Sequence, residues 1–356
     1  MKRHALLAIA MTVALAVYSQ REENVVFSGQ DTLHYGATLT FPQGVKKAPA
    51  VVIMSGTNPQ DRDGTMAGHK VFKEIADYLT AHGIAVLRMD DRGVGETNGN
   101  YADATTADFA DDCLAAVSYL KSRKDIDKRR IGAMGHSEGG ATISIAASMC
   151  KDIRFLISLA GLMTDGLSSL IRQNYDIVHS SPIPQHDMKR YDEINDIMFH
   201  KVYEHAEADS ATLAKILWDA YDEWKVKDDA YFKTLNIEFD HFRFPIYMYT
   251  MQATSRWYRF FIRYNPADYL CHVNVPVLAI NGTKDIMVNC EQNLANARRF
   301  LAHNKNVTTV AVDNVNHLLL PCEKGTQDEY KDIKEPVSEE VLSTIVDWLR
   351  KNRIIK

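Results

Sequence analysis

The chain has 356 residues, of which 46% are hydrophobic and 24% are charged, as in globular proteins and unlike disordered or fibrous ones. This length allows one large core or a core with an inserted subdomain. The formal net charge is −5, and the sequence has no basic stripe with interleaved aromatic residues. We therefore expect no nucleic-acid partner.

The N-terminus has the pattern of a secretory signal peptide. Lys2 and Arg3 precede an apolar run over residues 5–17, and Val17 and Ser19 suit the small-residue positions of a cleavage site. We predict residues 1–19 as the signal peptide, with cleavage after Ser19 and a periplasmic or secreted mature chain. An uncleaved anchor is the less favoured alternative, because about 13 apolar residues are short for a membrane span of about 20. We expect no membrane insertion once the signal is removed.

The next part of the chain, residues 20–161, alternates between strand and helix patterns. It opens with two alternating segments that predict an antiparallel hairpin. Apolar runs typical of strands buried on both faces then alternate with amphipathic helices. The expected strands are 50–54, 84–89 and 155–160, and the expected helices are 69–81 and 106–122. This order predicts an α/β protein with a doubly wound, mostly parallel sheet.

Residues 162–264 break this rhythm and are helical, aromatic and more highly charged. Apolar residues recur at helical spacing over 188–202 and 213–224, which predicts helices with their own core. We interpret the segment as an inserted helical cap. Its last part, 257–264, is denser in aromatic residues than one helix face needs, so Trp257 and Phe261 are candidate substrate-binding residues, with packing inside the cap as the alternative.

The core is expected to resume over residues 265–356. An apolar strand at 276–280 and a second strand at 308–312 flank a helix near 291–302, and an amphipathic helix over 338–350 closes the chain. Five cysteines are widely spaced and contain no C-x-x-C pair, so they predict no metal site. One disulfide remains possible in an exported protein, but the spacing does not identify its pair.

Ser137 lies in the sequence Gly135-His136-Ser137-Glu138-Gly139, which has the form G-x-S-x-G between a predicted strand and a predicted helix. In a nucleophile elbow this pattern places the serine on a strained turn, where flanking side chains would collide with the backbone. The alternative is an ordinary strand-turn-helix connection. The doubled glycine at 139–140 favours the elbow, so Ser137 is the candidate nucleophile.

A serine hydroxyl needs a base to take its proton and an acid to orient that base. In this topology both follow later strands, in the order Ser, acid, His. Asp285 follows the strand at 276–280 and His317 follows the strand at 308–312, so we predict the triad Ser137, Asp285 and His317. Asp313 is the alternative acid.

The predicted oxyanion hole uses the backbone N–H groups of Glu138 and Thr57. A Glu138 carboxylate directed inward would oppose an oxyanion, so we expect it to be held sideways by Arg92 or His69. His136 is expected to pack in the elbow with its ring away from Ser137. The acidic and basic residues at 61–63 are interpreted as a cluster that braces a loop, with recognition of a substrate charge as the alternative.

Several of these motifs together resemble the secreted bacterial α/β-hydrolases of the serine aminopeptidase-like and dienelactone hydrolase-like group, usually described as esterases. The similarity runs from about residue 33 to the end. It implies an α/β-hydrolase fold, the same triad and the same oxyanion donors. One departure is Thr57-Asn58, where the family more often has Ser-Gly. The motifs that carry the resemblance are 55–64, 68–70, 90–95, 135–140, 281–285 and 316–317.

The predicted function is hydrolysis of a small-molecule carboxylic ester through an acyl-enzyme, without metal or cofactor. The alternatives are an aminopeptidase, an acyl-thioesterase or an acyltransferase on the same fold, and, less favoured, a non-catalytic binding module. The oligomeric state is not predicted by the sequence.

Overall fold

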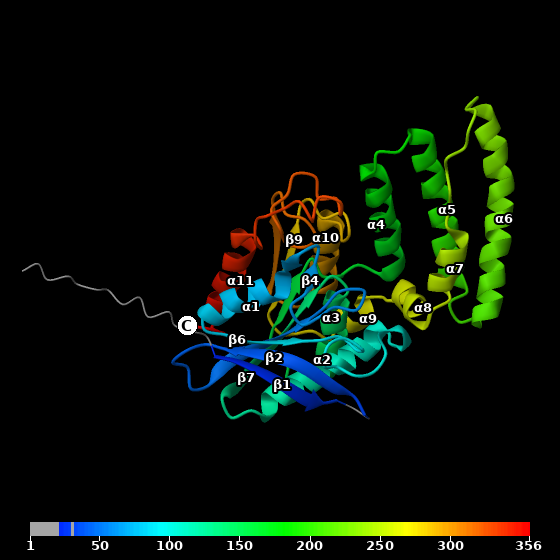
Figure 1. Cartoon of the computed structure of the whole chain (residues 1–356). Helices are drawn as coiled ribbons and strands as arrows, with labels where there is room; N and C mark the ends of the chain where they lie inside the picture. The colour runs from blue at the N-terminus through cyan, green and yellow to red at the C-terminus, as the bar shows by residue number, and fades with distance from the viewer. Residues whose placement is uncertain (1–20, 30–31) are drawn as a thin grey trace, which may run out of the picture.

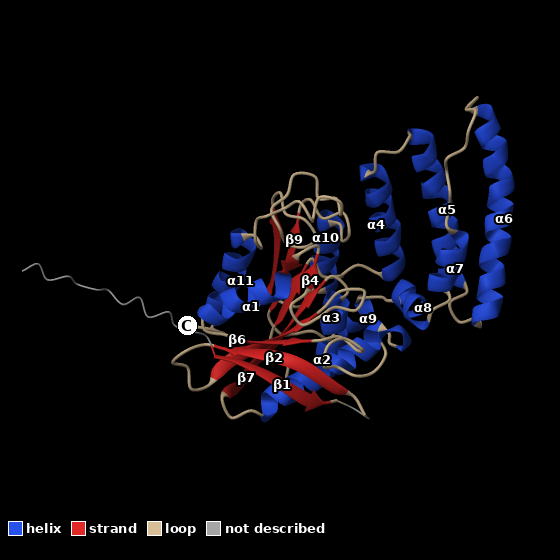
Figure 2. Ribbon diagram, viewed as in Figure 1, coloured by secondary structure: helices blue, strands red, loops and turns tan. Residues whose placement is uncertain are grey.

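The computed structural model describes residues 21–29 and 32–356. The predicted signal peptide lies outside the described residues. Helices cover both faces of a central sheet, and a group of helices extends to one side of it (Figures 1 and 2).

The central sheet has eight strands in the order β1-β2-β6-β3-β7-β8-β9-β10. The expected hairpin is present, since β1 pairs antiparallel with β2 and β2 pairs antiparallel with β6. All other pairings are parallel, which confirms the doubly wound, mostly parallel sheet. The strands are β1 (Arg21–Ser28), β2 (His34–Phe41), β3 (Ala48–Met54), β6 (Ala85–Met89), β7 (Ile126–His136), β8 (Leu156–Leu159), β9 (Val277–Gly282) and β10 (Val307–Val312).

The central strands are buried on both faces, which explains their continuous apolar sequences. Val51 and Val52 are both inaccessible to solvent but belong to different core clusters, because successive side chains point to opposite faces. One face is covered by α1 (Val71–Ala81) and α11 (Glu339–Lys351), and the other by α2 (Thr106–Ser122), α3 (Gly139–Met149) and α10 (Cys290–Phe300).

The first helix begins two residues later than predicted. His69–Lys70 forms the short strand β5, which pairs with β4 (Thr65–Met66), and α1 starts at Val71. The helix α2 begins at Thr106 as predicted, because Thr105 and Asp108 form a capping box in which each side chain accepts from the other residue's backbone N–H.

Five of the helices between β8 and β9 are called the cap helices here: α4 (Gly166–Ser180), α5 (Gln185–Glu204), α6 (Ser210–Thr234), α7 (Ile246–Ala253) and α8 (Arg256–Arg263). The short helix α9 (Ala267–Leu270) then leads to β9. Figure 1 shows α4, α5 and α6 standing beside the sheet, with α8 near the end of the cap that faces α2, α3 and α9. The predicted helical stripes are correct, since Ile194, Met198, Leu213 and Leu217 are buried within the cap.

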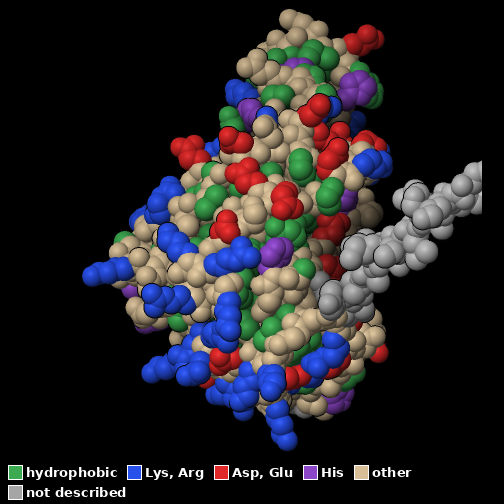
Figure 3. Space-filling model, turned by 90° about the vertical axis from the view of Figure 1, so that its left-hand side faces the viewer, with side chains coloured by type: hydrophobic (Ala, Val, Ile, Leu, Met, Phe, Trp, Pro, Cys, Tyr) green, Lys and Arg blue, Asp and Glu red, His purple; other side chains and the backbone are tan. Residues whose placement is uncertain are grey.

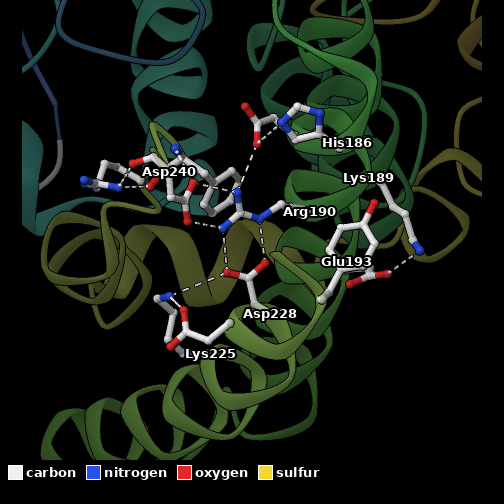
Figure 4. A network of polar contacts seen from close by, with 12 residues as sticks. His186, Lys189, Arg190, Glu193, Lys225, Asp228 and Asp240 are labelled. Carbon is white, nitrogen blue, oxygen red and sulfur yellow. Dashed lines mark hydrogen bonds and ion pairs between the residues drawn. The ribbon is translucent and has the colours of Figure 1, made fainter. Parts of the chain in front are cut away.

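A buried arginine joins three segments of the cap (Figure 4). Arg190 on α5 is 1% exposed and forms a bidentate pair with Asp228 on α6, at 2.6 and 2.7 Å. It forms a second bidentate pair with Asp240, at 2.8 and 2.7 Å, and donates to Asp187 at 3.1 Å. The ring of Phe242 lies 4.2 Å from the guanidinium carbon. Paired and stacked in this way, a buried guanidinium fixes how the segments pack.

Charges are unevenly distributed over the surface. Figure 3 shows lysine and arginine side chains gathered over the lower part of one face, with acidic side chains more frequent above them.

The five cysteines are all free thiols, so none of them forms the disulfide that the sequence left possible. Within the described ranges, no helix is long and apolar enough to cross a membrane.

Candidate active site

Ser137 lies at the sharp turn between β7 and α3. Its φ angle is +56°, in the left-handed region of backbone conformation that residues other than glycine rarely adopt. β7 ends at His136 and α3 begins at Gly139, so the turn occupies only two residues. This is the geometry of a nucleophile elbow, which presents a serine hydroxyl at the C-terminal end of the sheet.

The glycines of the motif are required by close backbone contacts. A Cβ atom on Gly135 would lie 2.1 Å from the carbonyl oxygen of Gly139. One on Gly139 would lie 2.5 Å from the carbonyl oxygen of Met54, and one on Gly140 would lie 2.5 Å from the carbonyl carbon of Gly161. These distances are too short for any side chain, so the sequence pattern follows from the packing of the turn against β3 and the end of β8.

Three side chains from distant parts of the chain form a continuous chain of hydrogen bonds. His317 Nε2 lies 3.0 Å from Ser137 Oγ, and His317 Nδ1 lies 2.9 Å from Asp285 Oδ2. The side chain of Asp285 is fully buried and that of His317 is 9% exposed. The structure therefore places together the three residues that the sequence suggested, whereas Asp313 is exposed at the surface.

Local hydrogen bonds hold the acid and the base in place. Asp285 Oδ1 accepts from the backbone N–H groups of Met287 and Val288, at 2.8 and 2.9 Å, which leaves Oδ2 for the histidine. The side-chain oxygen of Asn316, which is fully buried, accepts from two backbone N–H groups shortly after His317, those of Leu318 and Leu320. The two loops are thus ordered by their own sequences.

His136 packs beneath His317. Its Nε2 donates to the carbonyl oxygen of His317 at 2.8 Å, and the two rings are 4.8 Å apart. Its Nδ1 is buried without a partner among the described residues, which fits a neutral ring. Burial, together with the neighbouring His317, lowers the pKa of His136 to about 3. His136 is a packing residue, as expected, and its polar contact supports the backbone of His317.

The neutral His136 predicts a pH-dependent stability. Its pKa falls from an ordinary 6.5 to about 3 on folding, so the unfolded chain binds a proton in a range where the folded chain does not. The stability contributed by the neutral ring is therefore complete above pH 6.5 and is lost as the pH falls towards 3.

Urea unfolding of the wild type and of His136→Gln at pH 7 and pH 5 measures this effect. The wild type should lose more of its free energy of unfolding than the variant over this interval. Burial raises the pKa of Asp91 to about 7, which acts in the opposite sense, but it is present in both proteins and cancels in the difference. Equal losses in the two proteins would show that His136 does not titrate on unfolding.

The loop after β3 runs directly beside the serine. A Cβ atom on Gly56 would lie 2.7 Å from the Cβ of Ser137, so this approach requires glycine. Asp91 holds this loop through two hydrogen bonds: its carboxylate accepts from Ser55 Oγ at 2.6 Å and from the Gln60 backbone N–H at 2.8 Å. Within the described part of the chain, no acceptor is bound to the backbone N–H of Thr57 or of Glu138. Both donors are free to bind an oxyanion.

The expected partners of Glu138 were wrong. Arg92 pairs with Asp112, and His69 Nε2 contacts the carbonyl oxygen of Tyr330. The carboxylate of Glu138 is instead 3% exposed and accepts hydrogen bonds from three neutral side chains. The donors are Thr57 Oγ1 at 2.9 Å, Thr106 Oγ1 at 2.6 Å and Trp257 Nε1 at 2.8 Å. The prediction that the carboxylate is held to the side is correct, but the donors are uncharged.

The charged residues at 61–63 are engaged in structural contacts. Arg62 pairs with Asp90 at 2.5 Å and with Glu96 at 2.7 Å. Asp63 pairs with the buried Arg88 and with Lys70. These pairs tie the loop to β6 and its following turn, which agrees with a bracing role.

A cavity of about 500 Å³ opens above Ser137 and His317. Trp257 and Phe261, the candidate substrate-binding residues, both line it, and their rings stack with centroids 5.1 Å apart. Further lining residues, which no sequence motif indicated, come from α4, α7, the loop after β9 and the segment before α11: Leu170, Gln173, Gln252, Met287 and Tyr330. Leu170 and Gln173 share one face of α4, a spacing that could have indicated them once the cap was placed over the site.

Metal ligation has no candidate in the part of the chain that the structure describes, since no group of three or more His, Cys, Asp or Glu side chains is arranged to hold an ion.

Comparisons with known proteins agree with this architecture. The family described as serine aminopeptidase, S33, matches residues 63–220. Esterase EstD of Thermotoga maritima is 26% identical over 314 residues, which cover 88% of this chain but 65% of the esterase. Shorter matches include the thiohydrolase apmlB of Arthrinium phaeospermum, 27% identical over 114 residues that cover 32% of this chain and 35% of that protein.

Solved structures support the fold. An esterase of Pyrococcus furiosus aligns over 93% of both chains with a TM-score of 0.53 and 16% identity. The α/β-hydrolase GrgF of Penicillium aligns over 93% of this chain and 99% of its own, with a TM-score of 0.55 and 17% identity. At such low identity these likenesses show the fold alone.

Proposed function

We propose that this chain, an α/β-hydrolase similar to known esterases and to the S33 serine aminopeptidases, hydrolyses carboxylic esters through an acyl-enzyme on Ser137. The observation that carries the proposal is the hydrogen-bonded series from Asp285 through His317 to Ser137 at the floor of the cavity. A buried acid, an imidazole and an elbow serine in this order form a nucleophile with its own base.

In the proposed mechanism, Ser137 Oγ attacks the ester carbonyl carbon while His317 Nε2 accepts the hydroxyl proton. The backbone N–H groups of Thr57 and Glu138 stabilise the oxyanion, and Asp285 stabilises the imidazolium. His317 then protonates the leaving alcohol as the ester C–O bond breaks. Water attacks the acyl-enzyme, giving its proton to His317, and the acid leaves as the proton returns to Ser137.

The cavity favours an uncharged acyl group over the free amine of an aminopeptidase substrate. Of the described residues that line it, only Glu138 carries a carboxylate, and none is Lys or Arg. Glu138 already accepts three hydrogen bonds from the protein, so it offers little to a substrate ammonium group. Apolar side chains, among them Leu170, Trp257 and Phe261, supply much of the wall.

Labelling and turnover test the proposal directly. A fluorophosphonate should modify Ser137, located by mass spectrometry, and the protein should hydrolyse short p-nitrophenyl esters. The Ser137→Ala variant is the labelling control. Aminoacyl-p-nitroanilides should be much poorer substrates, and a preference for them would indicate an aminopeptidase instead. If the folded protein neither reacts with the probe nor cleaves any ester, the proposal fails.

A further inference from the structure

Glu138 joins three parts of the molecule that are distant in sequence. One oxygen, Oε2, accepts from the hydroxyl of Thr57, in the loop that borders the serine. The other, Oε1, accepts from the hydroxyl of Thr106, the first residue of α2, and from the indole N–H of Trp257 on the cap helix α8. The carboxylate is therefore a junction between the oxyanion loop, the core and the cap.

Among the residues that the structure describes, no cation pairs with this carboxylate. Within the described ranges, Glu138 forms no ion pair with Lys, Arg or His, and burial raises its pKa while the three hydrogen bonds oppose that rise. A buried carboxylate with only neutral donors is costly to maintain. An apolar side chain could fill the same space without the cost of burying a charge. Packing alone therefore does not explain why a carboxylate lies at this junction.

Two of the three donors, Thr57 and Trp257, also line the cavity above Ser137. The hydroxyl of Thr57 belongs to the residue whose backbone N–H is directed at the oxyanion in the proposed mechanism. The ring of Trp257 forms part of the cavity wall, where an acyl group would rest. Trp257 and Thr57 do not form a hydrogen bond with each other, so the Glu138 carboxylate connects them.

We propose, on the basis of the function proposed above, that Glu138 is a positioning residue that couples the cap helix α8 to the oxyanion loop. The hydrogen bond from Trp257 to Oε1 fixes the carboxylate of Glu138. The fixed carboxylate orients Thr57, so that the backbone N–H of Thr57 is directed at the developing oxyanion. When the indole N–H is missing or α8 is displaced, the loop loses this restraint. Oxyanion donors act through their preorganisation, so a loosened donor lowers kcat more than substrate affinity.

The test compares variants that keep the shape of each side chain. Trp257→Phe keeps an aromatic ring in the wall but removes the N–H, Thr57→Val removes the hydroxyl, and Glu138→Gln replaces one acceptor oxygen by an amide donor. Each should lower kcat for p-nitrophenyl acetate and p-nitrophenyl hexanoate by the same factor, about tenfold or more, with KM changed by less than about twofold. The double variant of Trp257 and Thr57 should be about as slow as the slower single variant. Both substitutions break the same connection, which runs from α8 through Glu138 to the oxyanion loop.

Trp218→Phe is the matched control. Trp218 lies on α6, is 39% exposed and does not line the cavity, so the same substitution there should leave kcat and KM unchanged. Near-ultraviolet circular dichroism and thermal midpoints identify any variant that does not fold. If one of Trp257→Phe and Thr57→Val does not fold, the kcat of the other still tests the coupling.

Three outcomes would overturn the coupling. A normal kcat in Trp257→Phe, effects of the two substitutions that multiply, or losses that appear in KM and grow with acyl length would make Trp257 only a wall residue. Failure of the wild type to react with a fluorophosphonate at Ser137 would instead overturn the proposed function, so the two failures are distinguishable.

Discussion

Replacing Asp285 by Asn should lower kcat for p-nitrophenyl esters by about 10⁴-fold, the effect expected when the acid of a serine triad becomes neutral. Asp285 Oδ2 accepts from His317 Nδ1, which leaves Nε2 as the base towards Ser137. An asparagine amide can donate to Nδ1 and so stabilise the wrong tautomer. It also cannot stabilise the imidazolium. Steady-state kinetics under saturating ester measure the loss.

Asp313→Asn is the control for this experiment. Asp313 is exposed and follows the last strand directly, at a position that the sequence allowed as an alternative acid. Its substitution should leave kcat within about twofold, as is usual for a surface change that breaks no special contact. A normal rate in Asp285→Asn together with a large loss in Asp313→Asn would transfer the role to Asp313.

The parts of the site that the sequence predicted are those set by short-range rules. The glycines around Ser137 are required by backbone contacts within the elbow itself, as the close approach of Gly135 to Gly139 shows. Asp285 and His317 follow strands of a parallel sheet, and the C-terminal ends of such strands meet at one edge. Topology alone therefore brought Asp285 and His317 to the nucleophile.

The parts that the sequence did not predict depend on how the cap packs on the core. Thr57, Thr106 and Trp257 meet at Glu138 from segments with no fixed spacing, so no motif indicates that they contact one carboxylate. Charge complementarity suggested Arg92 for this carboxylate, but Arg92 is engaged by Asp112, which is also buried. Competition between several buried acids for few cations is decided by tertiary packing and not by composition.

The buried network around Arg190 leads to the largest expected change in stability. Arg190→Met keeps a long apolar side chain beneath Phe242 but leaves the carboxylate of Asp228, whose side chain is 1% exposed, without its bidentate partner. Lys225 lies 3.7 Å from the same carboxylate and also pairs with Asp229, so it replaces only part of the lost charge. Removing one member of a buried ion pair costs about 3–5 kcal/mol, and we expect a loss of this size.

Urea unfolding measures the global loss, and hydrogen exchange of α5 and α6 also reports any local opening of the cap. Arg350→Met is the matched control: Arg350 is 49% exposed and contacts Asp347 at 3.4 Å on the surface of α11. Exposed pairs of this kind contribute about 0.5 kcal/mol or less. The hydrogen bonds from Arg190 also lower the pKa of Asp240 to about 2, so the stabilisation from that pair is complete above pH 3.8 and is lost as the pH falls towards 2. If Arg190→Met loses no more stability than Arg350→Met at neutral pH, the network does not stabilise the cap, and its cost in desolvation equals its gain in pairing.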